Sequence, residues 1–428
     1  MSIQDTIEPY IRALEHDTSI IKWRLYASYA EQSTVGFSKK SVADIYQPAS
    51  QQDGLSMQYA IELEGTKIAY GSINPTQTNP DDMITLAHKT AIVSPEALML
   101  ASHPKSSTLP KLIPDSGYPA NLLATLLPEA TRIRELLLEG DPKSIEGELQ
   151  GTHRHTAYAD STGTSVQVEA NRFEGSYELD GRFDVSFSTR SYDQLVPNLQ
   201  KNITENLAFG KALREDIIKP AKKHLPIFLM GGGELIDKFL LNHLSGMSIL
   251  TGSSRFTKED FEAQLLVTHP SVTLSFDQTR DLHIDSFGID SQGVMSQKYT
   301  AIQNGKLVEP ICDLKSAHRL GYTARTGSNT GEAVLNNLKT FEDLSAATGT
   351  YLLAFSALGI HTQNGLLGTY SLPCAECLYF KDGKLVGPVK PVITGNFFDV
   401  LKSDTMQFVS THREQEPMLF FETDVTFS

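Results

Sequence analysis

The sequence contains little cysteine, which excludes a disulfide scaffold. Only three cysteines occur in 428 residues, so a reducing cytoplasm is the expected compartment. Long apolar runs are also missing, since none approaches the roughly 20 residues that a membrane-spanning helix needs. Residues 1–19 lack the basic segment and apolar stretch of a secretory signal. We therefore expect a cytoplasmic protein without membrane contact.

Positive charge is scarce as well. The chain has 37 Lys and Arg residues against 51 Asp and Glu residues, a formal net charge of −14. A surface this negative disfavours wide contact with nucleic-acid phosphates, so no direct nucleic-acid partner is expected. Hydrophobic residues make up 40% of the chain and charged residues 21%, which is typical of soluble globular proteins. The length favours two domains.

Alternating apolar and polar residues predict several strands in the first half. Residues 55–63 and 67–73 should form two strands joined by a turn at Glu64-Gly65. Residues 166–170 and 175–179 show the same alternation on either side of a short gap, and they predict two further strands. The first half is therefore expected to be an α+β domain, which we place at residues 1–195.

Helices and loops are predicted by other patterns. Residues 100–128 are rich in Pro and Ser and predict a long surface loop, whereas residues 192–218 predict a long helix. In the second half, the apolar run 226–230 predicts a buried strand, and residues 234–247 predict the helix after it. Many short strands follow. We therefore expect residues 196–428 to form a β-rich, mostly antiparallel, barrel-like domain with a few helices, and the whole chain to be α+β.

Several motifs in the second half resemble those of one known family. The strongest are Gly368-Thr369-Tyr370-Ser371, the Asp382-Gly383 turn, Pro388-Val389 and Gly395-Asn396. In this order they resemble the C-terminal segment of the TldD/PmbA family, whose members are also called peptide-maturation proteins or modulators of DNA gyrase. Two further stretches support the resemblance: one carries Asp290, Gly293, the Asn304-Gly305 turn and Ser316-Ala317, and the other is residues 54–82. The resemblance implies this family's α+β fold and a function tied to peptide cleavage.

The family's zinc motif is absent. Its TldD branch carries H-E-x-x-x-H on the helix after the buried strand, and a late cysteine joins it at zinc. Here His243 occupies the first position, Leu244 stands where the glutamate would be, and Ser248 stands where the second histidine would be. None of the twelve histidines is followed by glutamate, and residues 413–428 contain no cysteine. The resemblance therefore implies the PmbA-like (TldE-like) branch, with no catalytic residue, no metal and no cofactor. It leaves enzyme activity of the chain alone uncertain.

Three other groups of residues have both a functional and a structural interpretation. His243 lies on an apolar helix, and a packed histidine is favoured over a contact to peptide substrate. Cys374-x-x-Cys377 lacks a second ligand pair, so buried, unpaired cysteines are favoured over a zinc or redox site. His153-x-His155 on a strand would point both rings to one face. With Asp160 and Glu169 this pair could contact a metal or substrate, although a solvated surface is favoured.

The leading functional hypothesis is a non-catalytic subunit. It pairs with a TldD-type zinc peptidase as a heterodimer, encloses its chamber and binds the peptide substrate. One alternative is a stand-alone binding or regulatory protein that forms a homodimer, and another is a hydrolase with a rebuilt site. The sequence predicts that the purified chain holds no stoichiometric zinc and cleaves no peptide alone.

Overall fold

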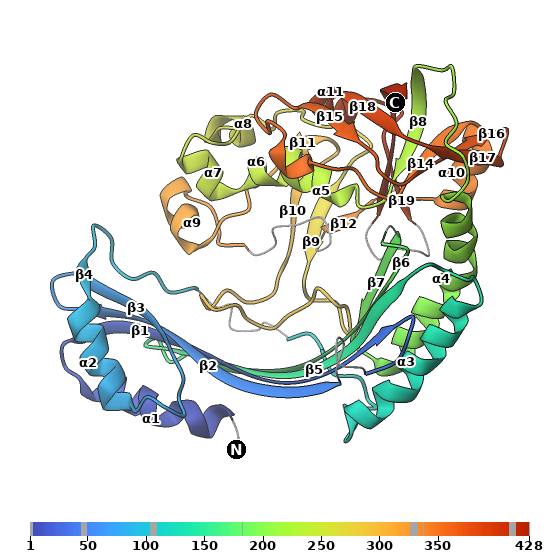
Figure 1. Cartoon of the computed structure of the whole chain (residues 1–428). Coiled ribbons are helices and arrows are strands. Elements are labelled where there is room, and N and C mark those ends of the chain that lie inside the picture. Colours follow the sequence, from blue (N-terminus) through green and yellow to red (C-terminus); the bar gives the residue numbers. More distant parts are fainter. Residues whose placement is uncertain are drawn as a thin grey trace.

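A long curved sheet forms the first half of the chain and faces the second half across its concave side (Figure 1). The computed structural model describes residues 3–43, 49–102, 109–181, 183–325, 333–336, 338–410 and 417–427. The sheet is antiparallel, in the order β4-β3-β2-β1-β5-β6-β7. Its strands are β1 (Ile20–Ser38), β2 (Ser50–Leu63), β3 (Lys67–Ile73), β4 (Ile92–Val93), β5 (Ile145–Asp160), β6 (Ser165–Leu179) and β7 (Phe183–Thr189).

The curvature of this sheet follows from the length of its strands. Strands β1, β2, β5 and β6 have 14 to 19 residues, which corresponds to about 45 to 60 Å at the usual rise per residue. Strands of this length accumulate the right-handed twist of a sheet and coil, so the sheet closes into a half-barrel. The predicted β2–β3 hairpin is confirmed.

The two strands predicted at 166–170 and 175–179 are one strand, β6. The prediction ended one strand at Ala170 and began the next at Gly175, whereas Gly175 is paired with Leu149 in the middle of the sheet. A Cβ at Gly175 would lie 2.6 Å from Cδ1 of Leu199 and 2.9 Å from Cδ2 of Leu149. The glycine is therefore needed for close packing of a helix on the sheet and not for a turn.

Helices cover both ends of the convex face (Figure 1). Helices α1 (Ile3–His16) and α2 (Pro80–Thr90) pack at one end, over a cluster that includes the odd-numbered β1 residues Trp23, Leu25 and Ala27. Helices α3 (Leu122–Leu138) and α4 (Tyr192–Ala212) pack at the other end, over a cluster that includes Val35 and Phe37. Because successive strand residues alternate between faces, the even-numbered residues of β1 point to the concave side.

Two helix boundaries differ from the sequence prediction. Helix α3 begins at Leu122, inside the predicted 100–128 loop, because Asn121 caps it by accepting a hydrogen bond from the amide of Ala124 at 3.1 Å. Residues 103–108 of that loop lie outside the described residues. Helix α4 ends at Ala212 rather than 218. The amide of Ile218 instead donates to the carbonyl of Pro388 at 2.9 Å, which ties the chain to a strand of the second half.

The second half contains two sheets and is mostly antiparallel, as predicted. The larger has the order β13-β19-β20-β8-β14-β16-β17, with β18 beside β20 and β15 beside β18, and the smaller has the order β11-β10-β9-β12. Only the β8–β14 and β13–β19 pairs of the described strands are parallel. The strands are β8 (His224–Leu229), β9 (Leu274–Asp277), β10 (Lys298–Gln303), β11 (Lys306–Leu307), β12 (Ala333–Leu335), β13 (Lys339–Thr340), β14 (Tyr351–Ala354), β15 (Thr369–Pro373), β16 (Cys377–Lys381), β17 (Lys384–Val389), β18 (Pro391–Asn396), β19 (Gln407–Ser410) and β20 (Met418–Phe427).

Short helices connect these strands. Both predicted hairpin turns are confirmed, since Asn304 and Gly305 have φ of 50° and 78°, and Asp382 and Gly383 have 52° and 73°. Positive φ at both central residues is what a type I′ turn requires. The helices are α5 (Gly233–Ile236), the π-helix η1 (Asp237–Leu241), α6 (Asn242–Leu244), α7 (Gly246–Leu250), α8 (Lys258–Glu262), α9 (Leu314–Leu320), α10 (Phe341–Thr348), the 3₁₀ helix η3 (Ile360–Thr362) and α11 (Phe397–Lys402).

One apolar cluster joins the two halves of the chain. It contains Leu195 and Leu199 of α4 together with Phe228 of β8, Leu353 of β14 and Leu378 of β16. Helix α4 thus crosses the predicted division at 195/196 and packs on both sides of it, so that division stays a prediction. No helix in the described ranges has the length and apolar character needed to cross a membrane.

Candidate functional site

His243 is a packed residue with both ring nitrogens already hydrogen-bonded. Its side chain lies on α6, and the residue is only 4% exposed. The amide of Arg255 donates to Nδ1 at 3.1 Å, so Nε2 carries the proton and donates to the carbonyl of Gly365 at 3.0 Å. Burial lowers the pKa of His243, which favours this neutral form. Neither nitrogen has a lone pair left for a metal ion.

The other two positions of the zinc motif do not approach His243 as ligands. Leu244 is fully buried in the apolar core. Ser245 has extended backbone angles, φ −64° and ψ 127°, so it ends α6, and Ser248 belongs to the separate helix α7. Gly246 follows the break in close contact with Cys312, where a Cβ would lie 2.5 Å from Sγ. These residues do not fit the zinc site of the TldD branch.

Aromatic rings and a cation complete the surroundings of His243. The ring centroids of Phe256 and Phe398 lie 6.1 and 6.0 Å from that of His243. The guanidinium carbon of Arg255 stands 3.8 Å from the centroid of the Phe398 ring, a cation–π arrangement. These contacts agree with the interpretation that the sequence favoured, in which His243 is a packed residue. A contact to peptide substrate stays a prediction.

The three cysteines are all buried and free. Burial raises the pKa of Cys312 to about 11 and that of Cys374 to about 12, so both thiols stay protonated near neutral pH and are poor nucleophiles and metal ligands. This agrees with unpaired structural cysteines at Cys374 and Cys377.

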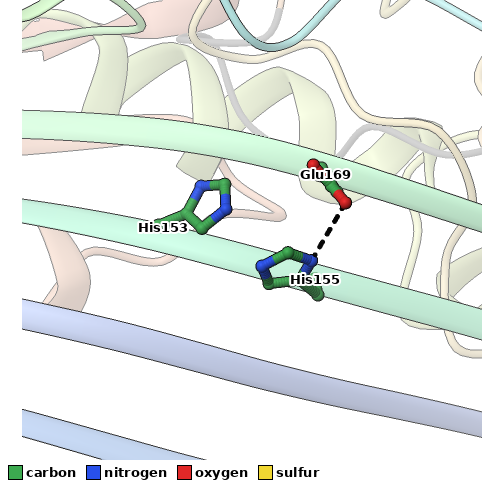
Figure 2. A group of neighbouring side chains, drawn as sticks. All are labelled: His153, His155 and Glu169. Carbon is green, nitrogen blue, oxygen red and sulfur yellow. Dashed lines mark ion pairs between the residues drawn. The ribbon is translucent and has the colours of Figure 1, made fainter. Parts of the chain in front are cut away.

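His153, His155 and Glu169 form a cluster, which the sequence analysis had named together with Asp160 (Figure 2). One nitrogen from each histidine and one carboxylate oxygen lie within 4.8 Å of one another. Asp160, which was expected to join them, does not. It lies seven residues after His153 on β5 and therefore points to the concave face, where it accepts hydrogen bonds from Tyr158 and from the amide of Thr162.

The sequence analysis missed an open trough on the concave face. A hollow of about 670 Å³ lies between even-numbered sheet residues, among them Tyr26, Ser28 and Arg154, and a crossing segment that includes Phe287 and Asp290. A second hollow of about 560 Å³ shares Tyr26, Arg154 and Phe287 with the first. The sequence did contain a signal, because the even-numbered positions in β1 and β5 are mostly polar. A face buried against an apolar layer would have apolar side chains at these positions.

Arg190 fixes the crossing segment to the sheet. Its guanidinium donates to the carbonyl oxygens of Asn171 at 2.7 Å, His283 at 3.2 Å, Ile284 at 2.7 Å and Ser286 at 2.6 Å. The residue is 8% exposed, and burial lowers its pKa to about 10. It therefore remains charged near neutral pH and closes one side of the trough.

Comparison with known proteins identifies relatives of both the second half and the whole fold. Residues 230–417 match the family model of the PmbA/TldA metallopeptidase C-terminal domain. An uncharacterised protein of Methanocaldococcus jannaschii is 22% identical over 303 residues, which are 65% of this chain and 67% of that protein.

Solved structures match nearly the entire chain. A proposed modulator of a DNA gyrase from Thermotoga maritima has a TM-score of 0.78 and 14% identity, with 99% of this chain and 100% of that chain covered. TldE from Thermococcus kodakarensis has a TM-score of 0.74 and 15% identity, with 98% and 99% covered. The second half of the chain therefore matches the PmbA/TldA metallopeptidase C-terminal domain, and the whole chain has the fold of these solved structures.

Proposed function

We propose that this chain is a PmbA-like (TldE-like) subunit without catalytic activity of its own, which pairs with a TldD-type zinc peptidase in peptide processing. The observation that carries the proposal is the state of the zinc-motif helix. The fold is retained, yet His243 is hydrogen-bonded at both nitrogens, and a buried leucine, Leu244, occupies the position of the general base. A peptidase needs an ionised carboxylate there to activate water, so the chemistry must come from a partner.

An exposed apolar surface beside this helix supports the pairing. Leu366 and Leu367 follow Gly365, the residue that accepts the hydrogen bond of His243, and they are 50% and 61% exposed. Their amides both donate to Oδ1 of Asn364, so the loop holds a defined shape with both leucines outward. The two leucines form a small exposed apolar surface, which a partner could cover. An obligate pair of this kind buries about 2,000 Å² or more.

Peptide substrate would be bound through backbone groups. Strands β15 and β17 each lie beside only one other strand of the described sheets. An extended peptide can add to such an edge, because its main chain supplies the hydrogen bonds and no specific side chain is needed. The trough on the concave face offers further polar groups that could contact a peptide substrate held between this chain and its partner.

The test is to mix the chain with the TldD-type protein of the same organism and to follow mass and peptidase rate together. We expect a hetero-complex whose peptidase rate exceeds that of the partner alone, and no cleavage by this chain alone. The double substitution Leu366→Asp and Leu367→Asp should abolish the complex, because two charges would be buried at its centre. The matched control is Ile92→Asp with Val93→Asp on β4, where the side chains are 71% and 72% exposed.

Two results would contradict the proposal. One is the absence of a hetero-complex together with full activity from the partner alone. The other is a homodimer of this chain that Leu366→Asp and Leu367→Asp leave intact, which would favour the stand-alone binding or regulatory protein.

A further inference from the structure

Two histidines and a glutamate converge on the convex face of the half-barrel, between the two pairs of helices. His153 and His155 are two residues apart on β5, so both rings leave the same face of the sheet. Glu169 lies directly opposite His155 on β6. The two imidazole rings are nearly perpendicular, with centroids 4.4 Å apart and an interplanar angle of 86° (Figure 2). The strand spacing alone thus brings three donor groups to one side.

Asn171 fixes the orientation and tautomer of His153. Asn171 is fully buried, and its amide nitrogen donates to the carbonyl of Gly117 at 3.0 Å, so its Oδ1 is the acceptor facing the histidine. Nδ1 of His153 lies 2.7 Å from this oxygen and must donate to it. The lone pair of His153 is therefore on Nε2, which accepts no hydrogen bond from the described residues. A histidine whose other nitrogen donates to a fixed oxygen is the usual arrangement of a metal ligand.

His155 and Glu169 supply the second and third donors. Nδ1 of His155 lies 3.2 Å from Oε1 of Glu169, so the ring and the carboxylate already point toward each other. Their side chains are 30% and 57% exposed, which leaves a path for an ion and room for water. Donor atoms around a zinc-class ion lie about 3 to 4 Å apart when each bond is about 2.1 Å. Atoms within 4.8 Å of one another reach that spacing by small side-chain rotations.

The surroundings favour a cation. Glu31 of β1 lies directly opposite His153 in the sheet register. Burial, with the charge of Glu31 as the next cause, raises the pKa of Tyr118 to about 12. Burial, followed by the hydrogen bond that its hydroxyl donates to Glu31, raises the pKa of Tyr29 to about 12. The rings of Tyr118 and Tyr29 stand beside His153 and His155, with centroids 5.1 and 6.2 Å apart. Negative charge and aromatic walls thus enclose the three donors from the β1 side.

We propose that His153, His155 and Glu169 bind a divalent transition-metal ion of the zinc class on the convex face, with water in the remaining coordination positions. Two imidazoles and a carboxylate form a donor set that such ions accept. The site is separate from the zinc-motif helix, which does not fit a metal ion. The ion would link β5 to β6, and Asn171 would extend the link to the loop that carries Gly117. This proposal departs from the expectation that the purified chain holds no stoichiometric zinc, which was based on the His243 helix.

Metal titration of the tag-free, chelator-treated full chain tests the proposal. We expect one Co²⁺ per chain, with visible absorption bands, and displacement of Co²⁺ by one equivalent of Zn²⁺. His153→Ala and His155→Ala should each weaken binding at least about tenfold, and Glu169→Gln should weaken it less, because a neutral amide oxygen remains. Without metal, His155→Ala should keep the melting temperature of the unsubstituted chain, and in both histidine variants the rise in melting temperature on adding Zn²⁺ should disappear.

His224→Ala is the matched control. Nδ1 of His224 lies 2.8 Å from Oδ1 of Asp424, and Nε2 lies 3.7 Å from Oε2 of Glu422, so it is another histidine among carboxylates, but a single one. Its loss should leave binding unchanged. Absence of stoichiometric binding, unchanged affinity in the His153 and His155 variants, or an equal loss in His224→Ala would each overturn the proposal.

Discussion

His243 shows how a residue can keep its place in a motif while its role changes. Replacing it by leucine would leave the amide of Arg255 and the carbonyl of Gly365 without their partner. Each unsatisfied, partly buried group costs about 1 kcal/mol or more. We therefore expect His243→Leu to lower the free energy of unfolding by about 2 to 3 kcal/mol.

Denaturant titration measures this loss, with the exposed His224→Ala as the control that should stay within about 0.5 kcal/mol. In the proposed hetero-complex, His243→Leu should leave the peptidase rate per folded molecule unchanged. Unchanged stability with a lost rate would instead identify His243 as a contact to substrate, the alternative that the sequence left open.

At the scale of elements, the turn between β8 and α5 depends on close backbone packing. A Cβ at Gly232 would lie 2.8 Å from Cγ of Leu419 and 3.0 Å from the carbonyl oxygen of Leu229. Because Leu419 and Leu229 are paired on adjacent strands of the sheet, neither can move without disturbing the core. We expect Gly232→Val to destabilise the fold by about 2 to 4 kcal/mol, measured as a lower melting temperature.

Gly54→Val serves as the control, since a Cβ at Gly54 meets no atom within 4 Å. A melting temperature for Gly232→Val equal to that of Gly54→Val would contradict this view of the turn.

The elements that the sequence predicted well are those fixed by local chemistry. Asn304-Gly305 and Asp382-Gly383 form their turns because these residues tolerate positive φ wherever they occur. The features that the sequence did not predict depend on contacts between residues far apart in the chain. The interruption at Ser245 fits Gly246 against Cys312, and Ile218, which was predicted to be helical, is bonded to Pro388 instead. No pattern within a short window contains such contacts.

The candidate site was predictable to a similar extent. The sequence placed His153 and His155 on one face and suggested Glu169, because the period of a strand is two residues. It also added Asp160, although an odd number of positions separates that residue from either histidine. The pairing of β5 with β6 decides which carboxylate stands opposite, and this register follows from the whole sheet.

At the scale of the whole molecule, Arg190 connects the half-barrel to the segment that crosses its concave face. One guanidinium holds four carbonyl groups, three of them on residues 283–286. Arg190→Met would keep much of the side-chain volume but remove every donor; hydrogen bonds to charged groups contribute about 1.5 to 3 kcal/mol each, and bonds made by one group add up to less than the sum of their separate contributions. We expect a stability loss of about 3 to 5 kcal/mol and faster hydrogen exchange at residues 283–291.

Two comparisons separate the anchoring role of Arg190 from its charge. Arg190→Lys keeps the charge but cannot reach four carbonyl groups in one plane, so it should give an intermediate loss. Arg172→Met removes a neighbouring cation whose side chain is 45% exposed, and it should cost less than about 1 kcal/mol. If Arg190→Met left exchange at residues 283–291 unchanged, the segment would be held by its own packing. In that case the trough would keep its shape without the arginine, and the two halves of the molecule would depend on their shared apolar cluster alone.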